Sequence, residues 1–267
     1  MRRFHLSAHL GYLFTDVALT DRFGAAARCG FRHVEHPSPY ELAAAEVADL
    51  CERHNLRMAQ IALPMGGAGQ KGLAAIPGRE HDFARSAEIA IAYARRIGCR
   101  QIHPMSGVPA NDLPVEKIAA TYLANLELVC GMAASEAIDV IVEPIGASGV
   151  PGYYLNHPTM AVGIIEQAAQ PNLRLSFDIY HAVGVELDPS DFVSKHGPLL
   201  AHVQIADAPG RHEPGTGAID FRLFFEALAT ADYEGVIGLE YHPVAETKSG
   251  LTWSSTFERI RLLKRAP

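Results

Sequence analysis

Three lone carboxylates and one amide stand at or near the ends of apolar segments of the sequence. Glu143, Asp178 and Glu240 each close a short run of apolar residues, and Gln204 lies near the end of a fourth run. The successive intervals are 35, 26 and 36 residues. Each interval suits one strand, one helix and two loops, because a βαβ unit takes roughly 30 or more residues. Four ends of successive parallel strands can meet at one point only if the sheet curls into a barrel, so we predict an α/β barrel.

The rest of the sequence supports this prediction, since strand-like and helix-like segments alternate throughout. The chain has 267 residues, and a (β/α)8 barrel takes roughly 250. We predict one (β/α)8 (TIM) barrel domain over residues 1–267, without a linker or low-complexity segment. Strands are expected at 4–9, 31–35, 56–63, 100–105, 140–143, 172–178, 199–205 and 236–240, and helices at 13–29, 41–54, 79–98, 114–137, 157–168, 189–196, 220–229 and 253–263.

Charge and composition argue against several classes of function. The formal net charge is −7, whereas a sequence-independent nucleic-acid binder normally presents a basic face. No run of 18 apolar residues exists, and the N-terminus lacks the apolar core of a signal peptide. The four cysteines form neither a CxxC pair nor a close cluster, so they indicate no disulfide framework and no thiolate zinc site. We expect a cytoplasmic protein that acts on a small molecule, without nucleic-acid or membrane partners.

A glycine-rich loop follows the strand predicted at 199–205. Alternation within that strand places His202 and Gln204 on one side and the apolar residues on the other. The loop at 206–217 then crowds charged residues, Arg211 among them, between glycines and prolines that are suited to unusual backbone shapes. This combination is typical of a binding site rather than of a hydrophobic core.

A second glycine-rich loop, at 65–72, contains Lys71. It lacks the GxxxxGK[ST] order of a phosphate-binding loop, and the next helix is expected to begin only near Arg79. We interpret this loop as a mobile segment over the mouth of the barrel.

The four polar strand ends offer an oxygen-only set of ligands. Such a set suits Mg²⁺ or Mn²⁺ better than a metal that prefers thiolates. Three carboxylates gathered without a cation would repel one another and force one of them to take up a proton. For any single strand-end carboxylate, a helix N-cap or a surface ion pair is the alternative. We interpret the set as a divalent metal site made by Glu143, Asp178, Gln204 and Glu240.

Three histidines, His181, His202 and His242, each lie within three residues of one of these four residues. His181 comes three residues after Asp178, and His202 comes two residues before Gln204. A histidine near a strand end is often a hydrogen-bonded structural residue. Beside a metal it can orient a carboxylate ligand or bind an oxygen of the substrate. We therefore predict that His181 and His202 contact the metal ligands or the substrate.

A metal flanked by two glutamates also suits proton transfer on an α-hydroxy carbonyl substrate. A metal that binds both oxygens would stabilise the enediolate that forms when a proton leaves the hydroxyl-bearing carbon. One glutamate removes that proton. The other returns a proton to the neighbouring carbon, which gives an aldose–ketose isomerisation, or to the same carbon from the opposite face, which gives an epimerisation. The residues leave both outcomes open.

Longer motifs resemble those of the hydroxypyruvate isomerase family, within the xylose isomerase-like barrels that also include ketose 3-epimerases and the endonuclease IV type. The most specific motif is HVQIADAPGRHEPGTGAIDF at 202–221. The resemblance covers nearly the whole chain and continues in GFRHVEHPSPYE (30–41), LPMGGAGQKGLAAIPGRE (63–80), VEPIGASGVPGYYLN (142–156), FDIYH (177–181) and GLEYHP (238–243).

The resemblance implies a function for individual residues. It implies metal ligands at Glu143, Asp178, Gln204 and Glu240, with Glu143 and Glu240 as the catalytic acid and base. The family's namesake reaction interconverts hydroxypyruvate and tartronate semialdehyde, and close relatives isomerise 2-oxo-tetronates. A homo-oligomer is also expected from the resemblance.

Both of these substrates carry a carboxylate, which needs a cation or backbone N–H donors. Arg211 and Lys71 are the candidates to bind it. The alternative for Arg211 is an ion pair that stabilises its own loop, with Glu213 or Asp207 as the partner.

Three positions depart from the family's pattern. His9 stands where an uncharged small or polar residue is expected, His36 and Pro37 follow the second predicted strand, and Ala62 replaces a frequent asparagine. All three are expected at the mouth of the barrel. They affect the choice of substrate and leave the predicted metal ligands intact.

The prediction is therefore a metal-dependent isomerase of a small hydroxy-carbonyl acid. The alternative within enzymes is a ketose 3-epimerase that acts on a free sugar. A DNA repair enzyme of the endonuclease IV type would need more histidine ligands and a basic groove. A non-catalytic sugar-binding barrel would be expected to lack a strand-end glutamate, and both Glu143 and Glu240 are present.

Overall fold

The structure is a computed structural model that describes residues 4–259, and the side chains of residues 4–256. The described chain divides into two compact units. The first unit comprises residues 4–36, 49–59 and 177–259, and the second comprises residues 37–48 and 60–176. Each unit is described by itself.

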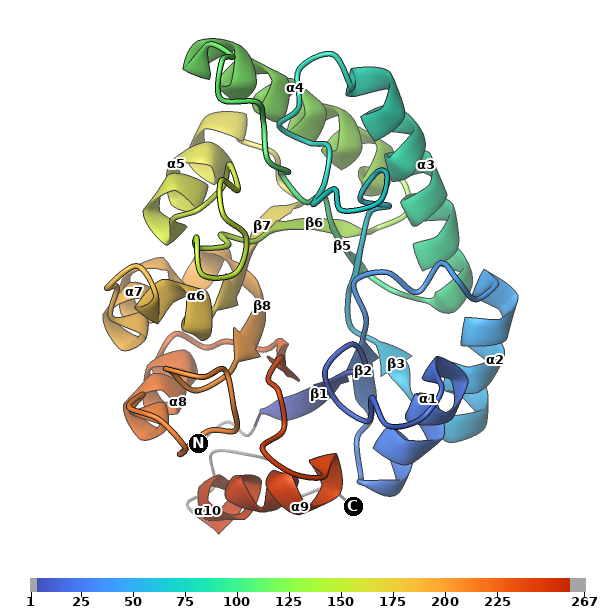
Figure 1. Ribbon diagram of the computed structural model, residues 1–267, viewed down its shortest axis with the longest axis vertical. Coiled ribbons are helices and arrows are strands. Elements are labelled where there is room, and N and C mark those ends of the chain that lie inside the picture. Colours follow the sequence, from blue (N-terminus) through green and yellow to red (C-terminus); the bar gives the residue numbers. More distant parts are fainter. Residues whose placement is uncertain (1–3, 260–267) are drawn as a thin grey trace. The chain divides into compact units, whose positions relative to one another are not determined.

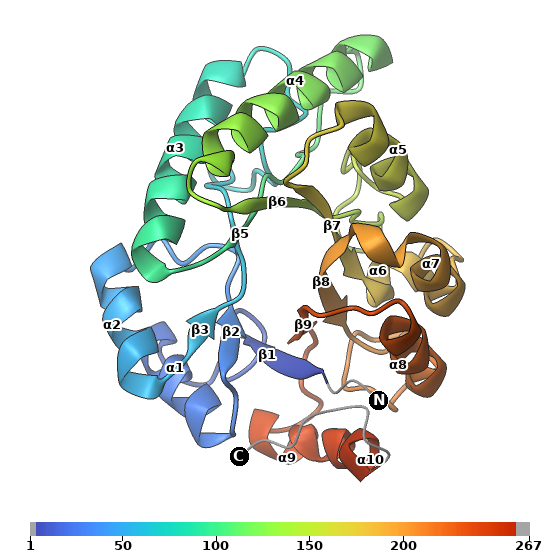
Figure 2. The same cartoon turned by 180° about the vertical axis from the view of Figure 1, so that it is seen from behind.

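The first unit contains a parallel sheet with the strand order β3-β2-β1-β9-β8. Its helices cover one side of the sheet, α7 and α8 lie side by side, and α6 lies next to β8 (Figures 1 and 2). The strands are β1 (His5–His9), β2 (His33–Glu35), β3 (Arg57–Met58), β8 (Leu200–Ile205) and β9 (Val236–Leu239). The helices are α1 (Leu19–Arg28), α6 (Ile179–Val183), α7 (Pro189–His196), η1 (Gly197–Leu199), α8 (Phe221–Thr230), α9 (Thr247–Gly250), η2 (Leu251–Trp253) and α10 (Ser254–Arg259).

The second unit contains a parallel sheet with the strand order β4-β5-β6-β7. Helices α3 and α4 pack against each other, α3 next to β5 and α4 next to β6 (Figure 1). The elements are β4 (Ile61–Ala62), α3 (Glu80–Ile97), β5 (Gln101–His103), α4 (Val115–Ala134), β6 (Asp139–Val142) and α5 (Pro158–Ala168), while α2 (Ala44–His54) and β7 (Leu173–Asp178) have residues in both units.

Local sequence signals explain where several helices begin and end. The Asp188 side chain accepts hydrogen bonds from the backbone N–H groups of Ser190 and Asp191, so it caps α7, and Pro189 occupies the first turn. Asp220 caps α8 in the same way through the N–H of Leu223. Gly98 ends α3 in the left-handed conformation, with a φ of 69°.

Most predicted elements are confirmed, with three differences. The strand expected at 56–63 is divided, because β3 pairs with β2 whereas β4 pairs with β5. The helix expected at 13–29 begins only at Leu19, since Phe14 takes a φ of 58°, which no α-helix accommodates. The short helices α6, η1, α9 and η2 are not predicted from the sequence. Of the closing helix expected at 253–263, α10 covers Ser254–Arg259, and the remaining positions lie outside the described residues.

The parallel register aligns the carboxyl ends of the strands in the first unit. His9, at the end of β1, lies opposite Glu35, at the end of β2. Gln204 of β8 lies opposite Gly238 of β9, and Glu240 follows one residue after β9 ends. Side chains from residues far apart in the sequence therefore gather at one edge of this sheet.

In the second unit, the glycine-rich loop at 65–72 is anchored at its C-terminal end. Gly72 forms an isolated antiparallel bridge with Ser106, and Ala75 N–H donates to the carbonyl oxygen of Ser106. Gly72 has a φ of +109°, and a Cβ there would collide with the carbonyl oxygen of Met105. Only glycine fits this close approach of two backbones.

We expect Gly72→Ala to lower the free energy of unfolding more than Gly69→Ala does. Both glycines have positive φ, but a Cβ at Gly69 meets no heavy atom within 4 Å, so Gly69→Ala is a control for backbone strain alone. The extra loss at Gly72 is expected to be ~1–3 kcal/mol, as for overpacking elsewhere. Urea unfolding of the two variants measures it, and equal losses would contradict the close approach.

No helix among the described residues is long and apolar enough to cross a membrane.

Candidate active site

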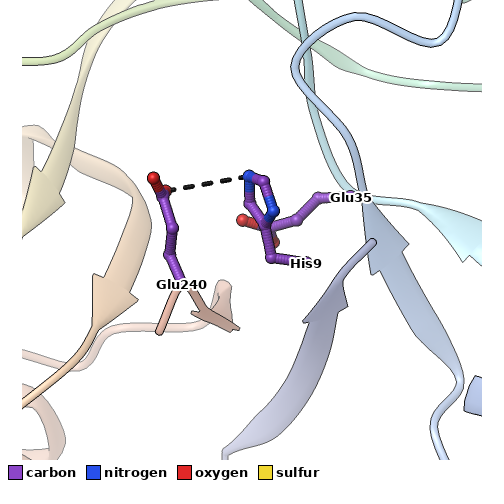
Figure 3. Close-up of side chains that lie close together, drawn as sticks. All are labelled: His9, Glu35 and Glu240. Atoms are coloured by element: carbon purple, nitrogen blue, oxygen red, sulfur yellow. Dashed lines mark ion pairs between the residues drawn. The ribbon is translucent and has the colours of Figure 1, made fainter. Parts of the chain in front are cut away.

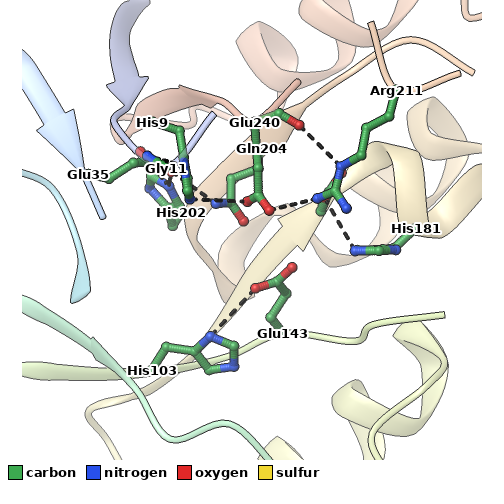
Figure 4. A network of polar contacts seen from close by, with 11 residues as sticks. His9, Gly11, Glu35, His103, Glu143, His181, His202, Gln204, Arg211 and Glu240 are labelled. Carbon is green, nitrogen blue, oxygen red and sulfur yellow. Dashed lines mark hydrogen bonds and ion pairs between the residues drawn. The ribbon is translucent and has the colours of Figure 1, made fainter. Parts of the chain in front are cut away.

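One guanidinium joins two of the predicted metal ligands in the first unit (Figure 4). Arg211 Nη2 lies 2.6 Å from Glu240 Oε1 and 3.3 Å from Asp178 Oδ2. The carbon at the centre of the guanidinium lies 5.0 Å from the ring centres of both Tyr12 and Tyr180, within range of cation–π attraction. The two carboxylates are therefore close enough to share a single positive charge.

Burial raises the pKa of Glu240 to about 7, and the negative charge of Asp178 adds to the increase. Arg211 opposes this shift because its positive charge favours the ionised carboxylate. A carboxyl group with a pKa near neutrality can both take up and release a proton at the pH of a cell. This pKa suits an acid–base role, and the catalytic role of Glu240 stays a prediction.

The loop that carries Arg211 is held by the buried carboxylate of Asp207. Arg211 itself takes a φ of 58° in this loop. The Asp207 carboxylate accepts hydrogen bonds from four backbone N–H groups, those of Ala208, Gly215, Gly217 and Ile219. Another loop carboxylate, Glu213, accepts from the N–H of Val244. Arg211 forms ion pairs with Asp178 and Glu240, which lie outside its own loop.

A second group of polar side chains surrounds Glu35, a residue that the sequence analysis did not select. The Gln204 Nε2 group donates to Glu35 Oε1 at 2.9 Å, and His202 Nε2 lies 3.2 Å from Glu35 Oε2. All three side chains are buried. Glu35 closes β2, but that strand contains a single apolar residue, Val34, so the apolar run that identified Glu240 is missing here.

Burial by itself would raise the pKa of Glu35, but the contacts with His202 outweigh it. The positive charge and the hydrogen bond that His202 can offer, together with His9, lower the pKa of Glu35 to about 2. Glu35 is therefore ionised at neutral pH, whereas Glu240 is only partly ionised. The two glutamates differ because they have different neighbours.

His9 lies between Glu35 and Glu240 (Figure 3). The backbone N–H of Gly11 donates to His9 Nδ1 at 3.2 Å, and His9 Nε2 lies 3.9 Å from Glu240 Oε2. Burial lowers the pKa of His9 to about 4, although Glu35 opposes the shift. The ring is neutral at pH 7, and because Nδ1 accepts a hydrogen bond, Nε2 carries the proton and faces Glu240.

His181 contacts a predicted metal ligand, as the sequence analysis expected. Its Nε2 atom lies 3.7 Å from Asp178 Oδ2, and both side chains are buried. The Asp178 Oδ1 atom accepts a hydrogen bond from the backbone N–H of Tyr180 and so caps α6. Asp178 therefore serves as a helix cap and as a partner of Arg211 at the same time.

Glu143 lies in the second unit, directly after β6, and its side chain is buried. His103, at the end of β5, places Nδ1 3.5 Å from Glu143 Oε2 (Figure 4). The sequence analysis missed this histidine. Lys71 is exposed on the loop at 65–72, and among the described residues it makes neither a hydrogen bond nor an ion pair.

Two features of the first unit fit the binding of a divalent cation. Asp178 and Glu240 offer carboxylate oxygens that can share one positive charge. Within residues 4–256, Gln204 Oε1 is buried and has no hydrogen-bond partner, so an amide oxygen is left to bind a further group. Oxygen ligands of this kind suit Mg²⁺ or Mn²⁺.

The sequence and structure were compared with known proteins. The family model described as the xylose isomerase-like TIM barrel matches residues 23–257. A 2-oxo-tetronate isomerase of Cupriavidus necator is 40% identical over 249 residues, which cover 92% of this chain and 96% of the relative. The chain belongs to the hydroxypyruvate isomerase family of xylose isomerase-like barrels. This confirms the resemblance and the predicted (β/α)8 barrel fold.

Two other proteins support the same conclusion. The hydroxypyruvate isomerase of Escherichia coli is 36% identical over 253 residues, which cover 94% of this chain and 98% of the relative. Among solved structures, a protein of Brucella melitensis described as an AP endonuclease of family 2 aligns with a TM-score of 0.92 and 35% identity, over 95% of this chain and 99% of its own. The extent of the single domain over 1–267 stays a prediction.

We expect Asp207→Asn to lower the free energy of unfolding by roughly 3 kcal/mol or more. Both oxygens of Asp207 accept hydrogen bonds, but an amide has only one acceptor oxygen. Each hydrogen bond to a charged group contributes ~1.5–3 kcal/mol. Asp191→Asn is the matched control, since the exposed ion pair between Asp191 and Lys195 is expected to contribute only about 0.5 kcal/mol to stability. Urea unfolding measures both variants. Equal effects of the two substitutions would contradict the role of Asp207.

We also expect the stability of the protein to fall as the pH drops from about 6.5 to about 4, partly through His9. The pKa of His9 is about 4 in the folded chain and 6.5 without burial, so the unfolded chain binds the extra proton in this range. The His9→Gln substitution is expected to reduce the slope by ~1 kcal/mol per pH unit. Urea midpoints across this range measure the slope of stability against pH. His81→Gln, at an exposed position, is the control and is expected to leave this slope unchanged. An equally unchanged slope in His9→Gln would contradict the burial of a neutral ring.

Proposed function

We propose that the protein is a metal-dependent isomerase of a small hydroxy-carbonyl acid, either hydroxypyruvate, which gives tartronate semialdehyde, or a 2-oxo-tetronate. The observation that carries the proposal is that Asp178 and Glu240 both form ion pairs with the guanidinium of Arg211. In the same unit, the amide oxygen of Gln204 is buried and has no hydrogen-bond partner among residues 4–256. The family membership supports it, because two named relatives are isomerases of these acids.

The proposed ligands of the metal, Mg²⁺ or Mn²⁺, are Asp178, Gln204, Glu240 and, from the second unit, Glu143. When bound, the ion supplies positive charge that stabilises the enediolate oxygens of the substrate. Asp178 supports this assignment because its Oδ1 atom is fixed by the N–H of Tyr180, so its other oxygen is oriented. The family pattern is the support for Glu143.

The proposed proton transfer uses the two glutamates. One carboxylate takes the proton from the hydroxyl-bearing carbon, and the other, as a carboxylic acid, gives a proton to the neighbouring carbonyl carbon. A hydroxyl proton moves from the first oxygen to the second, so the atoms balance and no redox partner is required. The pKa of Glu240, about 7, supports its exchange between the two protonation states. The neutral His9 ring, with Nε2 toward Glu240, limits the positive charge near this carboxyl group.

We propose that Arg211 binds the carboxylate of the substrate. Its guanidinium has five N–H donors in a planar arrangement that matches a carboxylate, and it is held between the rings of Tyr12 and Tyr180. His181 and His202 are proposed to orient the ligands or the substrate oxygens. Lys71 is proposed as a second cation for the carboxylate, since it is exposed on a loop.

A nuclease is a less suitable function, although one similar solved structure is described as an AP endonuclease. The formal net charge of −7 opposes the approach of a phosphate backbone. A cytoplasmic location and a homo-oligomer stay predictions. A ketose 3-epimerase is the alternative that the experiment below separates from the isomerase.

We expect Glu143→Gln and Glu240→Gln each to lower the rate of isomerisation ~10²- to 10⁴-fold, the range that one acid–base group contributes. The assay follows initial rates on hydroxypyruvate, a 2-oxo-tetronate and fructose with Mn²⁺. Glu166→Gln, at an exposed position of α5, is the matched control and is expected to keep the wild-type rate.

Turnover of fructose alone would contradict the proposed substrate class and favour the epimerase. Full activity of either glutamate variant on the acid substrates would contradict the proposed proton transfer.

A further inference from the structure

Glu35 is a fully buried charged group of the first unit that the proposed proton transfer does not use. It ends β2, its side chain is fully buried, and its backbone carbonyl oxygen accepts a hydrogen bond from the N–H of Leu10. A buried carboxylate is costly unless its oxygens receive hydrogen bonds. Glu35 Oε1 receives them from two side chains of one strand, β8, whereas Oε2 has no hydrogen-bond partner within residues 4–256.

These two donors are Gln204 and His202. Gln204 Nε2 donates to Glu35 Oε1 at 2.9 Å, and His202 Nε2 lies 3.3 Å from the same oxygen and 3.2 Å from Oε2. Because successive polar residues on one face of a strand are two positions apart, one carboxylate can contact both. Figure 4 shows the three side chains together.

An ionised carboxylate only accepts hydrogen bonds, and this property determines the orientation of the Gln204 amide. The Nε2 end of the amide must face Glu35, so the Oε1 end must face away from it. Oε1 is buried and has no hydrogen-bond partner in residues 4–256. The contact with Glu35 therefore presents an amide oxygen that is ready to accept another group.

The neighbouring strand β9 leaves room for the contact between Glu35 and Gln204. Gly238 of β9 pairs with Gln204 across the sheet. A Cβ at Gly238 would stand 2.7 Å from Glu35 Oε2 and would collide with Oε1. The absence of a side chain at this position is what allows the carboxylate to reach Gln204.

We propose that Glu35 is a positioning residue that holds the Gln204 amide with its oxygen presented to the metal. This inference rests on the proposed function, because Gln204 is a metal ligand only there. Glu35 itself stays bound to Gln204 and His202 and does not contact the metal. Partners of this kind typically change metal affinity 10- to 100-fold.

The test is the affinity of the full chain for Mn²⁺, measured by isothermal titration calorimetry and independent of any substrate. Glu35→Met keeps a side chain of similar length without acceptors, and it is expected to weaken Mn²⁺ binding ~10- to 100-fold. Glu35→Gln retains one acceptor oxygen and is expected to restore most of the affinity. Glu41→Met, at an exposed position, is the matched control and is expected to bind as the wild type does.

A double-mutant cycle separates positioning from a general structural effect. In a Gln204→Ala background, Glu35→Met is expected to cause no further loss of affinity. An equal loss in both backgrounds would overturn the inference. The inference would also be overturned if Glu35→Met bound Mn²⁺ as tightly as the wild type while Gln204→Ala bound it weakly. Unchanged Mn²⁺ affinity of Gln204→Ala would instead overturn the proposed function, since Gln204 would not be a ligand.

Gly238→Ala provides a second variant in case Glu35→Met does not fold, which circular dichroism detects. It leaves the chemistry of Glu35 unchanged and moves its carboxylate through the added methyl group. The expected result is again weaker Mn²⁺ binding that depends on Gln204. Wild-type affinity of a folded Gly238→Ala would contradict the proposal.

Discussion

Buried negative charge is the constraint on which the site of the first unit depends. Asp178, Glu35 and Glu240 are carboxylates with little or no exposure, and an isolated buried carboxylate is too costly to keep ionised. Each therefore needs a donor or a cation nearby. Arg211 supplies it for two of them, and Gln204 with His202 supplies it for the third.

The arrangement of these partners gives the two buried glutamates opposite properties. Glu35 receives hydrogen bonds and has a lowered pKa, whereas burial keeps the pKa of Glu240 near neutrality. A permanently ionised group is suited to hold a neighbour in place, and a group that titrates near pH 7 is suited to move protons. The proposed positioning role of Glu35 and the proposed acid–base role of Glu240 thus rest on different neighbours of the same type of side chain.

The sequence was sufficient to locate the ends of the strands before Asp178 and Glu240, because each interval between successive polar ends is about the length of one βαβ unit. Asp178 and Glu240 were predicted in this way, and the structure brings them together through Arg211. Glu35 also ends a strand but was missed, since that strand has three residues and only one of them, Val34, is apolar. The contact of Arg211 depends on how its loop folds around Asp207, which no local pattern in the sequence determines.

The most direct test of the account is proton NMR of hydroxypyruvate in D₂O with the intact protein, before and after removal of divalent metals with a chelator. The account predicts conversion to tartronate semialdehyde with deuterium entering at the carbon that receives the proton, loss of this reaction on chelation, and its return with Mg²⁺ or Mn²⁺. Isomerisation that continues unchanged in the chelated protein would contradict it.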